Sequence, residues 1–387
     1  MRGIVFTGGR ELELMDFPDP TPGPGEVVLE MKASGMCGSD RHQYRRAKGA
    51  KGASVGGLPS NPDPVIAGHE PCGIVAARGP GVTDADALIG ARVMVHHYQG
   101  CAHCEHCRSG WQQLCQQVPV KVYGNNAHGG HAKYLRVPAN TLVPLADELS
   151  FEAGAAISCG TGTAWGALRR MNLSGNDTIA IFGQGPVGLS GTQLAKAMGA
   201  RVIALDISPE RLDRAREFGA DEVVDSRSND PVAAIKDLTH GRGADCTLDT
   251  SSAPEGRIAA IRSAKVWGTM CFVGERNNVT IDVSPDILRK QLTMIGSWTF
   301  SVIGQAECAR FIVERNIAVD QLFTHRWKLE QAEEAYRLFD QQTTGKGVCL
   351  MGARHGRRLP RRIRSSAAAA SCPAAPAMAA RGPRAAC

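Results

Sequence analysis

Short apolar runs alternate with segments of helical periodicity through the middle of the chain. Five apolar runs, at 178–183, 201–206, 220–225, 244–250 and 268–274, have the length of buried strands. Segments of helical period separate them, at 185–199, 208–219, 231–241 and 254–263, and the apolar texture persists at 292–298. This alternation predicts βαβ units around a Rossmann-type, doubly wound parallel sheet, which we assign to residues 161–296.

The segments on either side have a different texture. Residues 1–160 hold short β-like runs, such as 27–31, 73–77 and 91–95, separated by glycine and proline turns. Near the other end, a helical pattern at 329–342 precedes a last strand at 347–351. The sequence therefore predicts an α/β protein with a mostly β domain over residues 1–160, to which the chain returns over residues 297–352.

Composition and charge are those of an ordinary globular chain with an unusual end. The chain has 387 residues, 43% of them hydrophobic and 21% charged, and this length favours two domains. The formal charge of +6 belongs to residues 353–387, which contain eight arginines and no acidic residue. We expect this Arg-, Ala- and Pro-rich tail to be disordered, either as a tether to acidic surfaces or as an inert extension.

Targeting signals and cysteine usage both bear on the compartment. The N-terminus does not read as a signal peptide, and no stretch approaches the roughly 20 apolar residues of a membrane span. The 13 cysteines are odd in number and clustered, so reduced thiols fit better than a disulfide framework. A cytoplasmic protein with no membrane partner is the expectation.

A glycine motif directly follows the first apolar run of the central region. Gly183, Gly185 and Gly188 form G-x-G-x-x-G between a predicted strand and a predicted helix. These glycines allow a tight turn and let a pyrophosphate approach a helix N-terminus. Asp206 ends the next strand, where a carboxylate binds ribose hydroxyls and repels a 2′-phosphate. The motif predicts NAD rather than NADP, and Arg211 is the residue that could soften this preference.

Four cysteines share one short segment. Cys101, Cys104, Cys107 and Cys115 have the spacing C-x2-C-x2-C-x7-C. Four thiolates from one loop can close a tetrahedron around zinc and leave no position for a substrate. A bacterial ferredoxin run begins in the same way, but its fourth cysteine follows after three residues and precedes a proline. We therefore predict a structural zinc, with His103 and His106 facing solvent.

A second group of potential ligands is scattered along the chain. The segment GMCGSDRH contains Cys37, AGHEPCG contains His69 and Glu70, and ISCGTGTAWG contains Cys159. Each residue alone is a weak signal, because a single histidine or cysteine is more often part of a core. Together, two thiolates and an imidazole match a catalytic zinc site whose fourth position stays open.

These motifs, in this order, resemble the zinc-dependent medium-chain dehydrogenases of the alcohol dehydrogenase family over residues 1 to about 352. The resemblance implies a GroES-like catalytic domain beside the Rossmann-type domain, and NAD with two zinc ions per chain. The residues that it assigns to the catalytic zinc are Cys37, His69 and Cys159, with Glu70 as an alternate or outer ligand. Asp40 would orient His69, while Ser39 and His42 would form a proton relay.

The implied reaction is hydride transfer between a primary or secondary alcohol and NAD, which gives an aldehyde or ketone. A polyol or L-threonine 3-dehydrogenase is the alternative within the family, although Cys159 at the third ligand position resembles the alcohol branch. Four polar residues leave the substrate open, because they either line a polar pocket or only satisfy loop backbone: His97, Asn125, Asn126 and His128.

The expected partners are a small-molecule alcohol and further copies of the chain. Relatives of this kind are usually dimers or tetramers, and the apolar strand at 292–298 is a candidate for joining subunits. A remote alternative is a nucleic-acid-binding zinc protein with an Arg-rich tail, but the rest of the chain is slightly acidic and lacks a basic stripe. A protein that keeps this fold without the activity is a third possibility.

Overall fold

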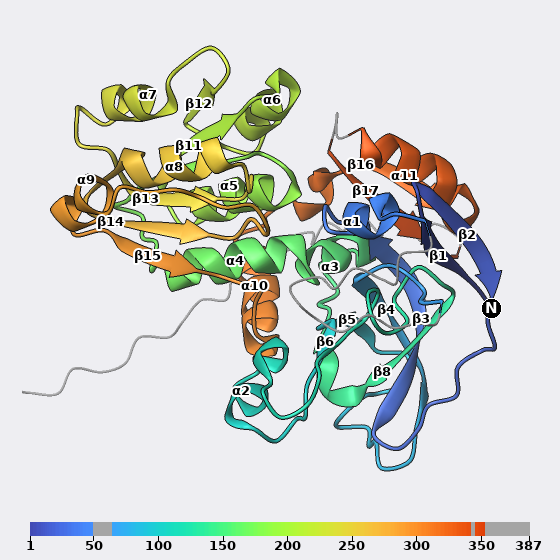
Figure 1. The fold of residues 1–387 in the computed structure, drawn as a ribbon. Helices are drawn as coiled ribbons and strands as arrows, with labels where there is room; N and C mark the ends of the chain where they lie inside the picture. The colour runs from blue at the N-terminus through green and yellow to red at the C-terminus, as the bar shows by residue number, and fades with distance from the viewer. Residues whose placement is uncertain (49–63, 342–344, 353–387) are drawn as a thin grey trace, which may run out of the picture. The chain divides into compact units, whose positions relative to one another are not determined.

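Two sheets organise the protein, one near each side of the fold (Figure 1). The computed structural model describes residues 1–48, 64–341 and 345–352, so the Arg-rich tail lies outside the described residues. The α/β architecture with a parallel sheet confirms the predicted fold class. The exact domain limits stay a prediction.

The central region forms a six-stranded sheet in the order β12-β11-β10-β13-β14-β15, in which every neighbouring pair is parallel. Its strands are β10 (Thr178–Phe182), β11 (Arg201–Asp206), β12 (Glu222–Asp225), β13 (Ala244–Asp249), β14 (Ala264–Phe272) and β15 (Thr293–Gly296). After β12 the chain crosses to the other side of β10, so the loops that follow β10 and β13 diverge. Such a switch in strand order opens a crevice at the carboxyl ends of the strands.

Four helices connect these strands: α5 (Pro186–Ala197), α6 (Pro209–Glu217), α7 (Pro231–Leu238) and α8 (Pro254–Ser263). Their starts follow ordinary capping chemistry. Ser208 caps α6 by accepting a hydrogen bond from the backbone N–H of Arg211, and Asp230 caps α7 in the same manner. A proline lies in the first turn of all four, where its missing N–H costs no helical bond.

Strands from residues 26–144 and 323–350 build the second sheet, in the order β16-β17-β3-β4-β5-β9 with β8 also paired to β3. Its strands are β3 (Glu26–Gly35), β4 (Glu70–Arg78), β5 (Arg92–Val95), β8 (Tyr134–Pro138), β9 (Leu142–Pro144), β16 (Phe323–Lys328) and β17 (Lys346–Leu350). β17 pairs antiparallel with β3, so the end of the described chain returns to its beginning. Two smaller pairs accompany this sheet, β1 (Arg2–Gly8) with β2 (Glu11–Asp16) and β6 (Tyr98–Gln99) with β7 (Lys121–Val122).

The helices absent from the sequence-based expectation include α3 (Phe151–Ile157), α4 (Gly160–Arg170) and α10 (Val302–Glu314). Nine consecutive residues of α4 are buried, so its sequence has no polar face and no helical period to detect. The predicted limit at residue 160 falls at the start of α4, and the mostly β region ends in helix. Within the described ranges, no helix is long and apolar enough to cross a bilayer.

The shorter helices lie in the connections of both sheets. They are α1 (Asp40–Arg45), α2 (Glu105–Arg108), α9 (Val283–Asp286) and α11 (Ala332–Asp340), with 3-10 turns at Gln112–Leu114, Ala139–Thr141, Leu288–Lys290, Val319–Leu322 and Leu329–Gln331. α11 follows the pattern predicted at 329–342, shortened by the 3-10 turn at its start.

The largest buried cluster is shared between the two sheets. Met94 of β5, Ile157 of α3, Leu168 of α4 and Ile181 of β10 all belong to it. α3 and α4 therefore pack between the sheets, and Cys159, the N-cap residue of α4, lies at their junction. This packing places a candidate metal ligand near the crevice of the parallel sheet.

Candidate active site

Sheet pairing and a helix junction bring the scattered ligands together. Gly35, near the end of β3, pairs with Glu70 at the start of β4, so Cys37 and His69 lie beside each other. Cys159 reaches the same place from the junction of α3 and α4. The ligand atoms of these three residues and a carboxylate oxygen of Glu70 all lie within 4.8 Å of one another.

The spacing of the two sulfurs fits a tetrahedral zinc. The Sγ atoms of Cys37 and Cys159 are 3.8 Å apart. Zinc–sulfur bonds of about 2.3 Å at a tetrahedral angle place two sulfurs roughly 3.8 Å apart. His69 and Cys159 are buried, and the hydrogen bond from Cys159 holds the pKa of the Cys37 thiol well below its ordinary value despite its burial. The donor set and its geometry therefore suit zinc.

Asp40 fixes the orientation of His69. An Asp40 carboxylate oxygen lies 2.9 Å from His69 Nδ1, and its other oxygen accepts the backbone N–H of Cys37 at 2.8 Å. Because a carboxylate only accepts, His69 carries its proton on Nδ1, and Nε2 is left with a lone pair for a metal. The hydroxyl of Ser39 lies 3.1 Å from this Nε2.

His42 lies two residues after Asp40 on α1 and is half-buried. Burial, together with the nearby charges of Arg276 and Arg41, lowers the pKa of His42. Across the described residues, no hydrogen bond joins its side chain to the Ser39 hydroxyl; the only bond between the two residues is from the His42 N–H to the Ser39 carbonyl. The relay residues are therefore neighbours in the sequence whose side chains share no hydrogen bond in the described part of the chain.

Glu70 has a partner that the sequence did not reveal. Lys346, the first residue of β17, is buried, and its Nζ donates to the Glu70 Oε1 at 2.7 Å and to the carbonyl of Met36 at 3.0 Å. Burial raises the pKa of Glu70 to about 7, although Lys346 opposes the shift. The only available signal for Lys346 was a lysine that begins an otherwise apolar strand.

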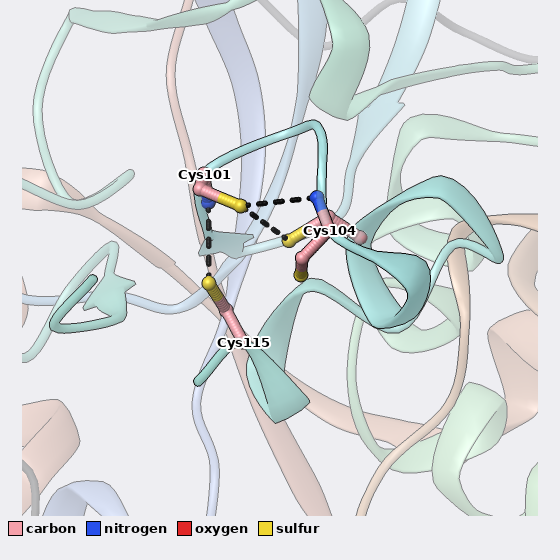
Figure 2. Close-up of side chains that lie close together, drawn as sticks. Cys101, Cys104 and Cys115 are labelled. Atoms are coloured by element: carbon pink, nitrogen blue, oxygen red, sulfur yellow. Dashed lines mark hydrogen bonds between the residues drawn. The ribbon is translucent and has the colours of Figure 1, made fainter. Parts of the chain in front are cut away.

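The four-cysteine segment forms a second cluster, and Figure 2 shows three of its sulfur-bearing side chains facing a common centre. The ligand atoms of Cys101, Cys104, Cys107 and Cys115 lie within 4.8 Å of one another, and the Sγ atoms of Cys101 and Cys107 are 3.8 Å apart. The backbone N–H groups of Cys104 and Cys101 donate to the sulfurs of Cys101 and Cys115, at 3.3 and 3.4 Å. This geometry fits a closed four-sulfur metal site.

The two histidines of this segment stay outside the sulfur cluster. His103 is exposed and its Nδ1 lies 2.7 Å from the Cys101 carbonyl. His106 is partly exposed and its Nε2 lies 3.5 Å from Glu105. Neither histidine places a ring nitrogen among the four clustered sulfurs.

The glycine motif forms the turn between β10 and α5. Gly183 has a φ of +94°, and a Cβ on Gly188 would come within 1.8 Å of the Gly183 carbonyl oxygen. A Cβ on Gly185, the N-cap of α5, would meet nothing within 4 Å, so the space beside the helix N-terminus is open. The turn thus offers an anion a close approach to backbone N–H groups.

Backbone donors hold the Asp206 carboxylate at the end of β11. One oxygen accepts the N–H of Gln184 at 2.6 Å, and the other accepts those of Ile207 and Ser208 at 2.8 and 3.0 Å. The Arg211 guanidinium lies 3.6 Å away. The buried carboxylate is therefore fixed beside the glycine turn, where a ribose would lie.

Comparison with known proteins matches both halves of the chain. Residues 23–147 match the model for the alcohol dehydrogenase GroES-like domain, and residues 186–314 match the model for zinc-binding dehydrogenases. An uncharacterized zinc-type alcohol dehydrogenase-like protein of Escherichia coli K12 is 39% identical over 90% of this chain and 98% of its own length. The chain belongs to the zinc-dependent alcohol dehydrogenase family. It is therefore an oxidoreductase of the medium-chain dehydrogenase class.

Two further relatives show the breadth of this dehydrogenase family. Sorbitol dehydrogenase of Bacillus subtilis is 30% identical over 90% of this chain and 96% of its own length. The solved structure of an alcohol dehydrogenase of Escherichia coli CFT073, complexed with NADH, has a TM-score of 0.79 and 26% identity, and covers 91% of this chain and 99% of that one. The predicted family and fold, with its GroES-like domain, are confirmed.

The polar residues expected near the dehydrogenase's substrate separate into two groups. His97 is buried beside the candidate catalytic cluster of Cys37, His69, Glu70 and Cys159. Its ring centroid lies 5.3 Å from that of His69, and its Nδ1 lies 2.9 Å from the Ser158 carbonyl. Asn126 bonds the backbone of Val122 within its own loop. Asn125 is partly exposed. The Nδ1 of His128 accepts the N–H of Ile66, and His128 lines a separate cavity of about 400 Å³.

Proposed function

We propose that this dehydrogenase transfers a hydride between an alcohol and NAD at a zinc held by Cys37, His69 and Cys159. The observation that carries the proposal is the convergence of two sulfurs and one imidazole at zinc spacing. With Glu70 held by Lys346 as an outer ligand, one tetrahedral position would be left for a substrate. The four-cysteine cluster would hold a second zinc with no open position. Two zinc ions per chain follow from these two donor sets.

Residues beside the candidate zinc would handle the proton of the alcohol. Bound zinc would lower the pKa of an alcohol hydroxyl, as it does for water. The hydroxyl of Ser39 lies 3.1 Å from Nε2 of His69, where it could accept that proton. His42 is partly exposed and its pKa is lowered by burial, so a neutral ring is available at pH 7 to pass the proton to solvent. Asp40 keeps His69 in the ligating tautomer.

NAD is the proposed coenzyme. The open space beside Gly185 and the N-terminus of α5 suit its pyrophosphate, and the fixed carboxylate of Asp206 suits its adenosine ribose. A 2′-phosphate would meet that carboxylate at close range, which disfavours NADP. Arg211 already faces Asp206, so part of its positive charge is neutralised there.

A substrate with a second polar group, such as a polyol or hydroxy-amino acid, is the other candidate, and His97 favours it. Its Nδ1 faces a carbonyl, which only accepts, so the proton of the ring is on Nδ1. Burial, followed by the proximity of His69 and His96, holds the pKa of His97 well below its ordinary value, so Nε2 is an acceptor. That acceptor lies next to the catalytic cluster and could bind a hydroxyl beside the reacting carbon.

Subunit association and location complete the proposal. We infer a homodimer or homotetramer joined along β15, the edge strand of the parallel sheet, whose residues Met294 and Ile295 are only half-buried. Eleven cysteines fall within the described residues and all are free thiols, which supports a reducing, cytoplasmic setting.

A substrate panel with metal analysis tests the function. Metal-replete protein is offered primary, secondary and polyhydric alcohols and hydroxy-amino acids with NAD or NADP, and NADH or NADPH absorbance is followed. We expect turnover with NAD and two zinc ions per chain. No turnover across the panel in zinc-loaded protein would refute the enzyme assignment.

The variant His97→Phe separates the two substrate classes. Removing the acceptor should lower kcat/KM for a polyol about 10-fold, because one substrate hydroxyl loses its partner, and should leave a simple secondary alcohol unchanged. The ratio of the two kcat/KM values is the measurement. An equal effect on both substrates would mean that His97 only shapes the pocket.

A further inference from the structure

A buried tyrosine from the far end of the chain contacts the carboxylate behind the candidate zinc. Tyr336 of α11 donates its hydroxyl hydrogen bond to the Asp40 carboxylate at 3.2 Å, on the same oxygen that accepts the Cys37 N–H. The other oxygen of Asp40 faces His69. Three donors from three parts of the chain therefore surround one carboxylate.

A histidine extends this contact by one step. His131 Nε2 lies 2.7 Å from the Tyr336 hydroxyl oxygen. Since that hydroxyl donates its proton to Asp40, it must accept from His131, which places the His131 proton on Nε2. The hydrogen bonds then run in one direction, from His131 to Tyr336 to Asp40, and meet the bond from His69 at the carboxylate.

Burial strengthens these hydrogen bonds, and packing fixes their geometry. His131 and Tyr336 are fully buried and Asp40 is nearly so, which removes competing water. The ring of Tyr336 packs edge-on against Phe6, with centroids 4.8 Å apart, and close to Tyr44 at 5.8 Å. The hydroxyl is therefore held toward Asp40 by the core of the domain.

The second nitrogen of His131 shows that the residue is not placed for packing alone. Its Nδ1 is buried and has no hydrogen-bond partner within the described part of the chain. An unpaired buried nitrogen has a free-energy cost that an apolar side chain in this position would avoid. The bond to Tyr336 is the one polar contact of this side chain that the described residues supply.

We propose that Tyr336 and His131 are positioning residues of the catalytic zinc, which fix Asp40 and, through Asp40, the ring of His69. This inference rests on the proposed zinc at Cys37, His69 and Cys159. Without the Tyr336 hydroxyl, the carboxylate keeps two of its donors and can rotate about its side-chain bonds. The imidazole then loses part of its orientation, and the metal is held less tightly.

The test compares Tyr336→Phe with Tyr44→Phe in zinc-loaded full-length protein. Both tyrosines are buried in the same aromatic cluster and both variants delete one hydroxyl, but the Tyr44 hydroxyl makes no bond to Asp40. Outer partners of metal ligands are typically worth 10–100-fold in metal affinity, so we expect Tyr336→Phe to release the catalytic zinc about 10-fold faster. Tyr44→Phe should release it at the wild-type rate.

Two readouts besides activity are used. Zinc release is timed with a chromophoric chelator, and the visible bands of the cobalt-substituted protein report the geometry at the metal. We expect shifted bands in Tyr336→Phe and unchanged bands in Tyr44→Phe. His131→Gln, whose amide can still donate to Tyr336, should lie between wild type and Tyr336→Phe on both measurements.

The outcomes separate this inference from the proposed function. Wild-type release rates and cobalt bands in Tyr336→Phe would overturn the positioning role while leaving the enzyme assignment intact. Equal changes in Tyr336→Phe and Tyr44→Phe would overturn it too, because they would show a general effect of core packing. A wild-type protein that binds one zinc per chain and keeps it when Cys159 is replaced by alanine would instead refute the catalytic zinc itself.

Discussion

The two candidate metal sites hold their ligands in opposite ways. The four-cysteine cluster takes every ligand from one loop with its short helix α2, and three of the four side chains are partly exposed. The catalytic cluster takes Cys37 and Cys159 from positions 122 residues apart and adds His69, the residue before β4. A short segment of sequence determines the geometry of the four-cysteine cluster, whereas the geometry of the catalytic cluster forms only when the whole domain is folded.

The surroundings of the two sites differ in the same sense. In the four-cysteine cluster, the sulfurs accept hydrogen bonds from backbone N–H groups of the loop itself. In the catalytic cluster, hydrogen bonds among side chains hold the groups around the ligands instead: Asp40 accepts from His69 and Tyr336, and Lys346 donates to Glu70. A site with one open metal position has only three protein ligands, so other side chains must hold these ligands in place. Four sulfurs bound to one metal hold one another in place through the metal.

Removing one ligand of the catalytic cluster should have the largest effect and tests whether the two metal sites are independent. Cys159→Ala should lower kcat by about 1,000-fold or more, because metal activation of the alcohol is worth several kcal/mol. Zinc should fall from two ions to one per chain while the fold survives. NADH formation and metal analysis on the same sample measure both effects.

The four-cysteine cluster serves as the control for that experiment. If Cys159→Ala also emptied this cluster or unfolded the chain, the two sites would not be independent. Zinc retained at one ion per chain, with an unchanged circular dichroism spectrum, establishes that the remaining ion belongs to the four cysteines.

The reciprocal variant is Cys104→Ser. A structural zinc contributes directly to folding, so we expect a loss of about 3 kcal/mol in the free energy of unfolding and one zinc ion per chain. Turnover per folded molecule should change by less than about 3-fold, since no ligand of the catalytic cluster is touched. Urea unfolding and initial rates at low temperature measure the two quantities. A collapse of kcat with normal stability would contradict the structural role.

This contrast also explains what the sequence could predict. The glycine motif at Gly183 and the spacing from Cys101 to Cys115 are contiguous patterns, and the structure brings their residues together as expected. Cys37, His69 and Cys159 are individually ordinary residues, and only their occurrence as a set suggested a site. The alternation of strands and helices sufficed for the parallel sheet because its central strands are buried and each of the four helices that connect its strands begins with a proline.

The features that the sequence did not predict depend on long-range contacts, which no local sequence pattern indicates. Tyr336 lies 296 positions from Asp40, and Lys346 lies 276 positions from Glu70, so no spacing rule connects them. The helix α4 went undetected because it is buried on nearly every side, and its sequence therefore lacks a polar stripe. Long-range hydrogen bonds and all-round burial are both products of tertiary packing.

The smallest predicted difference between the two regions is their response to acid. His96, next to the catalytic cluster, is fully buried, and burial lowers its pKa to about 4 although the Phe300 carbonyl opposes the shift. The unfolded chain takes up this proton near pH 6.5, before the folded chain does, so acid favours unfolding. The contribution is complete above about pH 6.5 and declines as pH falls toward about 4.

Between about pH 7.5 and 5, this one group should account for a loss of about 2 kcal/mol in the free energy of unfolding. His96→Gln removes the titrating group, so its urea-unfolding free energy should fall less over that interval than that of the wild type. His103→Gln, at the exposed histidine of the four-cysteine segment, is the matched control for the histidine-to-glutamine substitution itself. Equal slopes in all three proteins would mean that His96 already titrates normally in the folded state, and that the buried and exposed regions do not differ in this respect.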